Sequence, residues 1–140
     1  MKRLPALLLV VLLLTSASFL FACDTKASTE KMLEAHLWGV NMLGDSAYVA
    51  SSPITLQFSA GKLGGSTGMN HYSGTYALKS GNSISIAVGA TTKAAGDPEA
   101  VATEATFLNG LAATASYAVD EESLTLFDST GAAVVTLRAK

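Results

Sequence analysis

Short runs of alternating apolar and polar residues, separated by turn residues, constrain the fold of this chain more than any other feature. Ile54, Leu56 and Phe58 share one parity in such a run, and this period-two spacing predicts a half-buried strand. A second clear run extends from Ile84 to Val88, directly after the turn residues 80–83. Weaker runs lie at 36–43, 63–68, 72–78, 117–119, 124–127 and 133–137. The succession predicts antiparallel strands with one buried face.

One segment breaks the alternation and carries the signals of a helix. Asp97-Pro98-Glu99 combines an N-cap residue, a proline in the first turn and an acidic side chain near the positive end of the helix dipole. Apolar residues follow at helical spacing, namely Val101, Ala105, Leu108 and Leu111. We expect the helix to end near Ala113, with Glu104 pointing outward.

The predicted fold class is therefore α+β and rich in β-structure. We expect a curved antiparallel sheet or partial barrel of about seven or eight strands, with one helix packed on it. One hydrophobic core suffices for a chain of this length, so we expect a single domain.

The N-terminal segment has the order of a secretory signal: positive charge, an apolar run, then small residues. Lys2 and Arg3 precede the unbroken apolar run from Leu7 to Leu14. The end of the segment resembles a bacterial lipobox, with Leu20 and Ala22 before Cys23. The resemblance implies cleavage before Cys23 and attachment of acyl chains such as palmitate to its thiol. Several acyl chains would hold the protein firmly, since one chain binds a membrane only marginally.

Three interpretations of this segment are open from the sequence. A lipoprotein signal is favoured because Cys23 is the only cysteine and stands where the segment ends. The alternatives are an ordinary cleaved signal and an uncleaved anchor, because a spanning helix needs about 20 apolar residues. We expect a signal peptide at 1–22, the lipidated cysteine with a flexible polar tether at 23–31, and one domain at 32–140.

The charge of the chain argues against nucleic-acid binding. Two of the nine basic residues lie in the signal, so seven basic side chains face eleven acidic ones in the rest. A mildly acidic domain lacks the clustered Lys and Arg that bind the phosphates of nucleic acid. It also lacks a basic stripe that would grip anionic lipid. We therefore expect no nucleic-acid partner.

The order of elements from Leu37 to Leu137 resembles the META domain, the family of HslJ-like proteins. The family motif Gly-Cys-Asn-x-Tyr-x-Gly-x-Tyr is similar to residues 68–76, which read Gly-Met-Asn-His-Tyr-Ser-Gly-Thr-Tyr. Weaker similarities lie at Leu37-Trp38, Thr92–Gly96, Glu104, Phe107-Leu108, Tyr117, Leu124–Leu126, Asp128 and Gly131. The resemblance implies a fold and an envelope or stress context, and it brings no established enzymatic activity.

The chain departs from that family at two cysteines. Met69 and Gly96 stand where the family has Cys. If the two family cysteines meet in relatives, their joint loss here leaves no orphan thiol. A redox or metal role for these two positions is excluded in this chain, and the sequence does not decide whether Met69 touches Gly96.

The motif also contains the candidate ligand or partner loop, formed by Asn70, His71, Tyr72 and Tyr76. The alternative interpretation is structural: Asn70 would cap a turn, and the tyrosines would pack in the core with their hydroxyls at the rim. The two interpretations differ in whether these side chains converge on an open pocket or pack inward.

The sequence offers little for catalysis or metal binding. His36 and His71 are the only histidines, and neither has a paired ligand at helical spacing or a thiolate nearby in sequence. We therefore expect no metal and no cofactor. No nucleophile-elbow motif is present, so an enzyme is not expected. The alternative is a small hydrolase or isomerase that uses His71 with Ser66, Ser73 or an aspartate.

Together these features predict a membrane-anchored envelope lipoprotein that carries a non-enzymatic binding or stress-response module. We expect it outside the cytoplasm, on the periplasmic or surface side of a bacterial membrane. Its partners would be the membrane, through the lipid at Cys23, and an envelope protein or small molecule at the candidate loop. A passive structural module without a ligand is the third possibility.

Overall fold

The structure of the protein, a computed structural model, describes the backbone of residues 21–140 and the side chains from Thr25 onward. The predicted signal peptide at 1–22, apart from its last two residues, and the side chain of Cys23 lie outside the described part. Within residues 21–140, no helix has the length and apolar character needed to cross a membrane.

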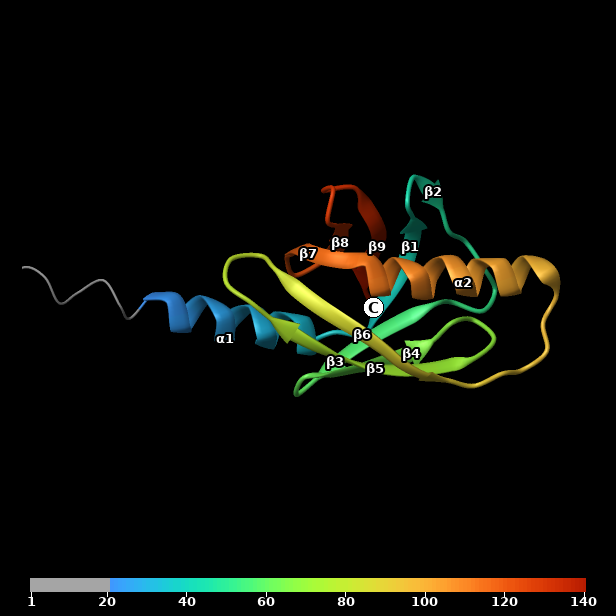
Figure 1. The fold of residues 1–140 in the computed structure, drawn as a ribbon, viewed down its shortest axis with the longest axis horizontal. Coiled ribbons are helices and arrows are strands. Elements are labelled where there is room, and N and C mark those ends of the chain that lie inside the picture. The colour runs from blue at the N-terminus through green and yellow to red at the C-terminus, as the bar shows by residue number, and fades with distance from the viewer. Residues whose placement is uncertain (1–20) are drawn as a thin grey trace, which may run out of the picture.

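The described residues form two helices and nine strands (Figure 1). The helices are α1 (Phe21–Glu34) and α2 (Pro98–Ala113). The strands are β1 (Trp38–Leu43), β2 (Ser46–Ala47), β3 (Thr55–Ser59), β4 (Lys62–Ser66), β5 (His71–Leu78), β6 (Ile84–Thr91), β7 (Thr114–Val119), β8 (Ser123–Asp128) and β9 (Ala133–Ala139).

Eight of the strands form one antiparallel, nearly closed barrel. Their order is β6-β5-β4-β3-β1-β9-β8-β7, and β2 pairs with β1 off this path. The two ends of the order meet at a bridge between Ser83 and Ser116, beside which the backbone N–H of Tyr117 donates to the carbonyl of Asn82 at 3.0 Å. The predicted α+β, β-rich partial barrel is confirmed, and β2 is the strand that the sequence analysis did not predict.

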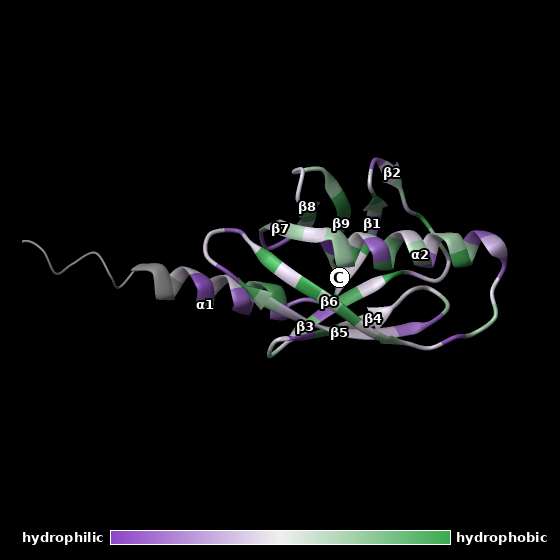
Figure 2. Ribbon diagram, in the orientation of Figure 1, coloured by the Kyte–Doolittle hydropathy of each residue, from purple (hydrophilic) through white to green (hydrophobic). Residues whose placement is uncertain are grey.

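The alternating runs set the core as predicted. Ile54 and Leu56 are fully buried, and Phe58 is nearly so. Ile84 and Ile86 point inward from β6, where Figure 2 shows hydrophobic positions alternating with less hydrophobic ones. Such an inner row on each strand removes apolar surface from water at about 25 cal/mol per Å², which drives closure of the barrel.

Helix α2 completes this core. It contacts β6 on one side and β8 and β9 on the other, and Figure 1 shows it lying across the strands. Its N-cap is Asp97, whose carboxylate accepts from the N–H of Ala100 at 2.9 Å, as predicted. The buried face centres on Phe107 and Leu111, both fully buried, whereas Val101 is 48% exposed and lies outside the face on which the sequence analysis placed it.

Helix α1 corrects the predicted flexible tether at 23–31, because the backbone of this segment is helical. The composition of the polar stretch from Asp24 to Lys31 predicts a linker. This stretch contains Ala, Lys and Glu, which favour helix, and the apolar residues Met32 and Leu33 follow it. Short helices are marginal alone and gain most of their stability from packing. Tertiary contacts of the last turn of α1 therefore decide whether this segment is helical.

Those contacts fix the end of α1 to the barrel. Leu33 is fully buried, and its carbonyl accepts from the indole N–H of Trp38 at 2.9 Å. The Oε1 atom of Glu34 accepts from the backbone N–H of Ala60 at 2.5 Å and from the hydroxyl of Tyr76 at 3.2 Å. The last turn of α1 is thereby held by apolar burial and three hydrogen bonds, while the rest of the helix projects from the barrel (Figure 1).

The contact between Tyr76 and Glu34 predicts an altered alkaline titration. Burial, and then the negative charge of Glu34, raise the pKa of Tyr76 to about 12. Because the folded pKa exceeds that of the unfolded chain, the associated stability is present below pH 10 and is lost as pH rises through about 12. Glu34→Gln should lower the pKa of Tyr76 in an ultraviolet titration of tyrosinate. Glu122→Gln, on the exposed β7–β8 turn, is the control, and an equal fall in both variants would contradict the assignment.

Candidate functional site

Asn70, the first residue of the predicted loop, points into the protein and joins three segments. Its side chain is 3% exposed. The Oδ1 atom accepts from the N–H of Ala94 at 2.7 Å and from the hydroxyl of Thr92 at 3.1 Å. The Nδ2 atom donates to the Oε2 of Glu104 at 2.9 Å. Asn70 therefore ties the turn before β5 to the segment after β6 and to α2.

Thr67 completes the same network from the other end of the turn. The hydroxyl of Thr67 donates to the carboxylate of Glu104 and accepts from the N–H of Asn70 at 2.9 Å. The backbone N–H of Thr67 donates to the carbonyl of Asn70 at 2.8 Å. Glu104 thus points toward this turn, and its predicted outward orientation is wrong. The sequence could not show this, since the helical spacing of apolar residues says nothing of a polar partner 34 positions away.

The other three predicted loop residues do not converge with Asn70 on an open pocket. Tyr72 is 4% exposed and its hydroxyl donates to the carbonyl of Thr55 at 2.8 Å, while burial raises its pKa. Tyr76 is buried with its ring edge-on to Phe58 at a centroid distance of 4.9 Å. His71 alone is exposed. The structure therefore places two tyrosines in the core and one histidine on the surface.

His71 is not paired with a nucleophile. Ser66 lies opposite His71 in the β4–β5 register, so the two residues are neighbours across the strands. The hydroxyl of Ser66, however, accepts from the N–H of Gly68 at 3.0 Å, and the described residues show no hydrogen bond from it to the His71 ring. A hydrolytic site needs a nucleophile held by its base.

No metal site is evident in the described part of the chain either. Among the side chains described, from Thr25 onward, no three His, Cys, Asp or Glu side chains are grouped so that they could hold a metal ion.

Met69 and Gly96 are in contact, which answers a question that the sequence left open. A Cβ atom added at Gly96 would clash with the Sδ of Met69, and it would lie 3.4 Å from the terminal methyl carbon. The two positions that are cysteines in the family are therefore adjacent here. A flexible thioether packed on a bare Cα fills the space between the turn at 67–70 and the start of α2.

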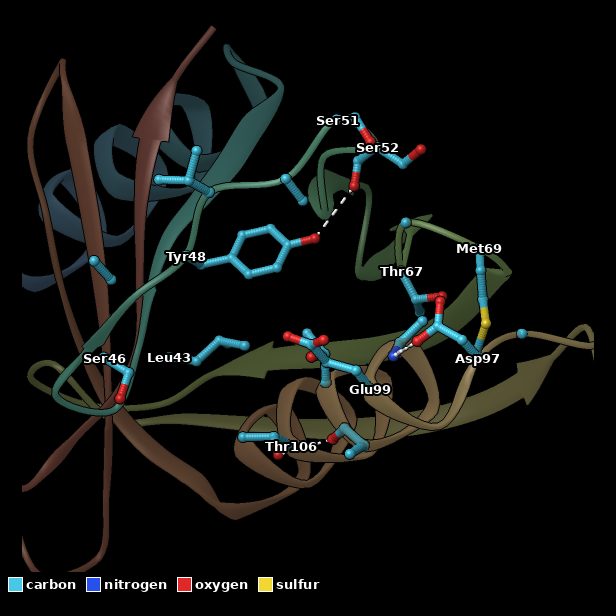
Figure 3. Close-up of a pocket in the computed structure, with 18 residues that line it drawn as sticks. Leu43, Ser46, Tyr48, Ser51, Ser52, Thr67, Met69, Asp97, Glu99 and Thr106 are labelled. Carbon is cyan, nitrogen blue, oxygen red and sulfur yellow. Dashed lines mark hydrogen bonds between the residues drawn. The ribbon is translucent and has the colours of Figure 1, made fainter.

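A groove with a volume of about 750 Å³ lies beside this contact. One wall is formed by β2 and the segment that follows it, and the other by the N-terminal half of α2 (Figure 3). The turn containing Thr67, Gly68 and Met69 lies between the walls. The remaining lining residues are Leu43, Ser46–Ser52, Gly96, Asp97, Glu99, Ala100, Ala102, Thr103 and Thr106.

Tyr48 shapes the first wall of the groove. Its N–H donates to the carbonyl of Asn41 at 2.8 Å, and its hydroxyl donates to the carbonyl of Ser52 at 3.2 Å (Figure 3). Gly68 lies against this wall with a positive φ of 92°, where an added Cβ would come within 2.9 Å of the Ser52 carbonyl oxygen. Only glycine allows this close approach without strain.

No pattern in the sequence predicts this groove. Its walls come from segments about fifty positions apart, of which one is the two-residue strand β2 with the irregular stretch after it. Neither has a ligand-binding motif, since the Asp97-Pro98-Glu99 signature of the second segment only marks the start of a helix. The one usable signal was the cluster of Gly68, Met69 and Asn70, which marks the turn between the walls.

Fold and groove together define a small β-barrel domain covered by a helix. The family model for the META domain matches residues 31–140. The protein therefore belongs to the META domain family, as the resemblance of residues 68–76 implied. This is a family that is not known for catalysis.

Several solved structures are similar to this chain, among them the following two. A crystal structure of a DUF4847 family protein from Bacteroides vulgatus has a TM-score of 0.64 at 14% identity, and the match covers 80% of this chain and 97% of that one. An NMR structure of a protein from Burkholderia xenovorans has a TM-score of 0.64 at 23% identity and covers 81% of this chain and 87% of that one. At these identities the likeness shows the fold. No curated protein matches this chain.

Proposed function

We propose that this protein is a non-enzymatic binding module that is anchored in the bacterial cell envelope and holds its ligand in the groove between β2 and α2. The groove carries the proposal, because its volume of about 750 Å³ falls in the range of ligand sites, roughly 300–1,000 Å³. Its lining mixes an aromatic ring, a thioether and several hydroxyls without a base paired to a nucleophile. Such a lining suits recognition better than bond cleavage.

The envelope location rests on the N-terminal segment. The charged start, the apolar run and the small-residue end before Cys23 support export, and the position of the only cysteine supports lipid attachment. We propose that acyl chains on Cys23 hold the domain on the outer side of a cytoplasmic or outer membrane. A role in stress response fits the family context and would act through the same ligand.

Intact mass tests the anchor. Protein purified from its native membrane should begin at Cys23 and carry acyl chains, and Cys23→Ala should abolish both the added mass and the membrane association. An unmodified chain that starts after the signal would make it a free secreted domain. A full-length chain would make residues 1–22 a membrane anchor instead.

Amide NMR spectra test the groove. Fractions of an envelope extract should give saturable shifts that cluster at Tyr48, Met69 and Thr103. Thr103→Trp places a large ring in the groove and should remove these shifts. Thr75→Trp, on an exposed position of β5, is the matched control and should keep them. Shifts that map elsewhere, or none in any fraction, would count against the proposed site.

The hydrolase or isomerase alternative now has less support. It needs His71 near a bound substrate and a nucleophile, whereas His71 lies outside the groove lining and Ser66 bonds to a backbone N–H. A passive module remains the competing interpretation, and the NMR experiment separates it from the binding module.

A further inference from the structure

We propose that the groove binds an extended, positively charged peptide segment, an inference that rests on the proposed binding function and specifies its ligand. The charge of the lining is the first observation. Asp97 and Glu99 are acidic, and no Lys, Arg or His lines the groove. Lys93 is exposed in the segment before α2 and lies outside the lining. Groups of one sign in a cleft favour a partner of the opposite sign.

The start of α2 does not reverse this preference. A free helix N-terminus attracts anions through its unpaired N–H groups and its dipole. Here the carboxylate of Asp97 already accepts from the N–H of Ala100 at 2.9 Å. Glu99 adds a second negative charge in the first turn, and its side chain has no hydrogen-bond or salt-bridge partner within the described residues. An anionic ligand would therefore be repelled by the carboxylates of Asp97 and Glu99, whereas a cationic ligand could bind the unpaired carboxylate of Glu99.

The backbone of the opposite wall supplies the second observation. Strand β2 pairs with β1 along one edge, which leaves its other edge without a strand partner in the described structure. Val49, Ala50 and Ser51 follow, and all three are exposed, Val49 to 94%. Among residues 21–140, their backbone N–H and C=O groups have no hydrogen-bond partner. The free edge of β2 with this unpaired backbone after it can accept an added extended segment, the mode of recognition called β-augmentation.

The α2 wall leaves room for the side chains of such a segment. Glu99, Ala102, Thr103 and Thr106 lie at helical spacing along one stripe and all line the groove. Beyond Glu99 these side chains are small, so alternate side chains of an extended peptide can lie between the two walls. A Lys or Arg at the end near the start of α2 would reach the free carboxylate of Glu99.

Selection from a random peptide library tests the proposal. Phage-displayed decapeptides are selected on the mature chain, and the recovered sequences should be enriched in Lys and Arg. One recovered peptide is then synthesised. Its affinity should fall at least about tenfold with Glu99→Lys and change less than about twofold with Glu121→Lys. Glu121 is exposed on the β7–β8 turn, so this control makes the same charge change outside the groove.

The strand pairing is tested on the peptide itself. N-methylation of alternate residues removes peptide N–H donors without changing the protein, and it should weaken binding at least about tenfold in one of the two registers. Equal affinity in both registers would overturn the backbone pairing.

Two further outcomes would overturn the proposal. Recovery of neutral or acidic peptides whose binding is lost in Thr103→Trp would refute the charge preference and leave the groove as the binding site. Recovery of no peptide that depends on the groove would refute a peptide ligand altogether. The NMR shifts from envelope fractions would then decide the proposed function separately.

Discussion

Replacing Gly74 by alanine is expected to destabilise the barrel by about 3 kcal/mol or more. Gly74 lies in β5 opposite Val88 of β6, just after a break in the register of these two strands. A Cβ at Gly74 would clash with the backbone carbonyl oxygen of Ala87 and would lie 3.2 Å from the Cα of Val88. Both obstacles are backbone atoms of the sheet, so relief requires the two strands to separate and to lose ladder hydrogen bonds.

Gly89→Ala is the matched control on the same strand pair. Its nearest obstacle is the carbonyl oxygen of Ser73 at 3.3 Å, which a small shift relieves. Urea unfolding should give a cost below about 1 kcal/mol for Gly89→Ala and a much lower midpoint for Gly74→Ala. Domains have only about 5–15 kcal/mol of stability, so Gly74→Ala should be near the limit of folding. Equal midpoints for the two variants would mean that the close approach at Gly74 has no energetic role.

Asn70→Ala is expected to cost about 2–4 kcal/mol. The change leaves the N–H of Ala94 without its acceptor, leaves the hydroxyl of Thr92 only its longer bond of 3.5 Å to the His71 carbonyl, and removes one donor from the carboxylate of Glu104. A partly buried group that loses its partner pays part of the cost of desolvation, and the Glu104 carboxylate also loses a charge-assisted hydrogen bond. The network also holds α2 against the turn before β5. The substitution should therefore destabilise both this turn and the contact that α2 makes with it.

Hydrogen exchange distinguishes a local loss of the Asn70 contacts from a general loss of stability. In Asn70→Ala, exchange of the Ala94 amide and of amides in the first turns of α2 should accelerate more than exchange in β8 or β9. Asn109→Ala, on an exposed position of α2, is the control and should leave both stability and local exchange nearly unchanged. Uniform acceleration across the barrel would contradict the role assigned to Asn70.

The parts of the fold that followed from the sequence are those set by local patterns. The parity of Ile54, Leu56 and Phe58 faces the core as expected, because a strand with one buried face has only one arrangement of its side chains. The start of α2 at Asp97 followed from capping chemistry that acts within three residues.

The parts that did not follow depend on distant partners. Helix α1 is polar through most of its length, and its order rests on Leu33 and Glu34 meeting the barrel. The motif marks Asn70 as a special residue, but the helical spacing predicts a solvent-facing position for Glu104, its partner on α2. The groove joins two segments without a ligand-binding motif, so no local pattern could reveal it.

Helix α1 has a consequence for how the barrel would be presented if the lipid is attached at Cys23. At about 1.5 Å of rise per residue, the ten residue steps from Cys23 to Leu33 set a stand-off of about 15 Å. The groove is lined by the N-terminal half of α2, the end of that helix remote from α1 in Figure 1, so it would lie on the side of the barrel far from the lipid. Because each residue of a helix adds both rise and rotation, the length of α1 sets both the distance of the groove from the lipid and its orientation about the helix axis. One inserted residue would turn the groove by about 100° about the α1 axis, whereas seven would raise it by about 10 Å and nearly restore its bearing.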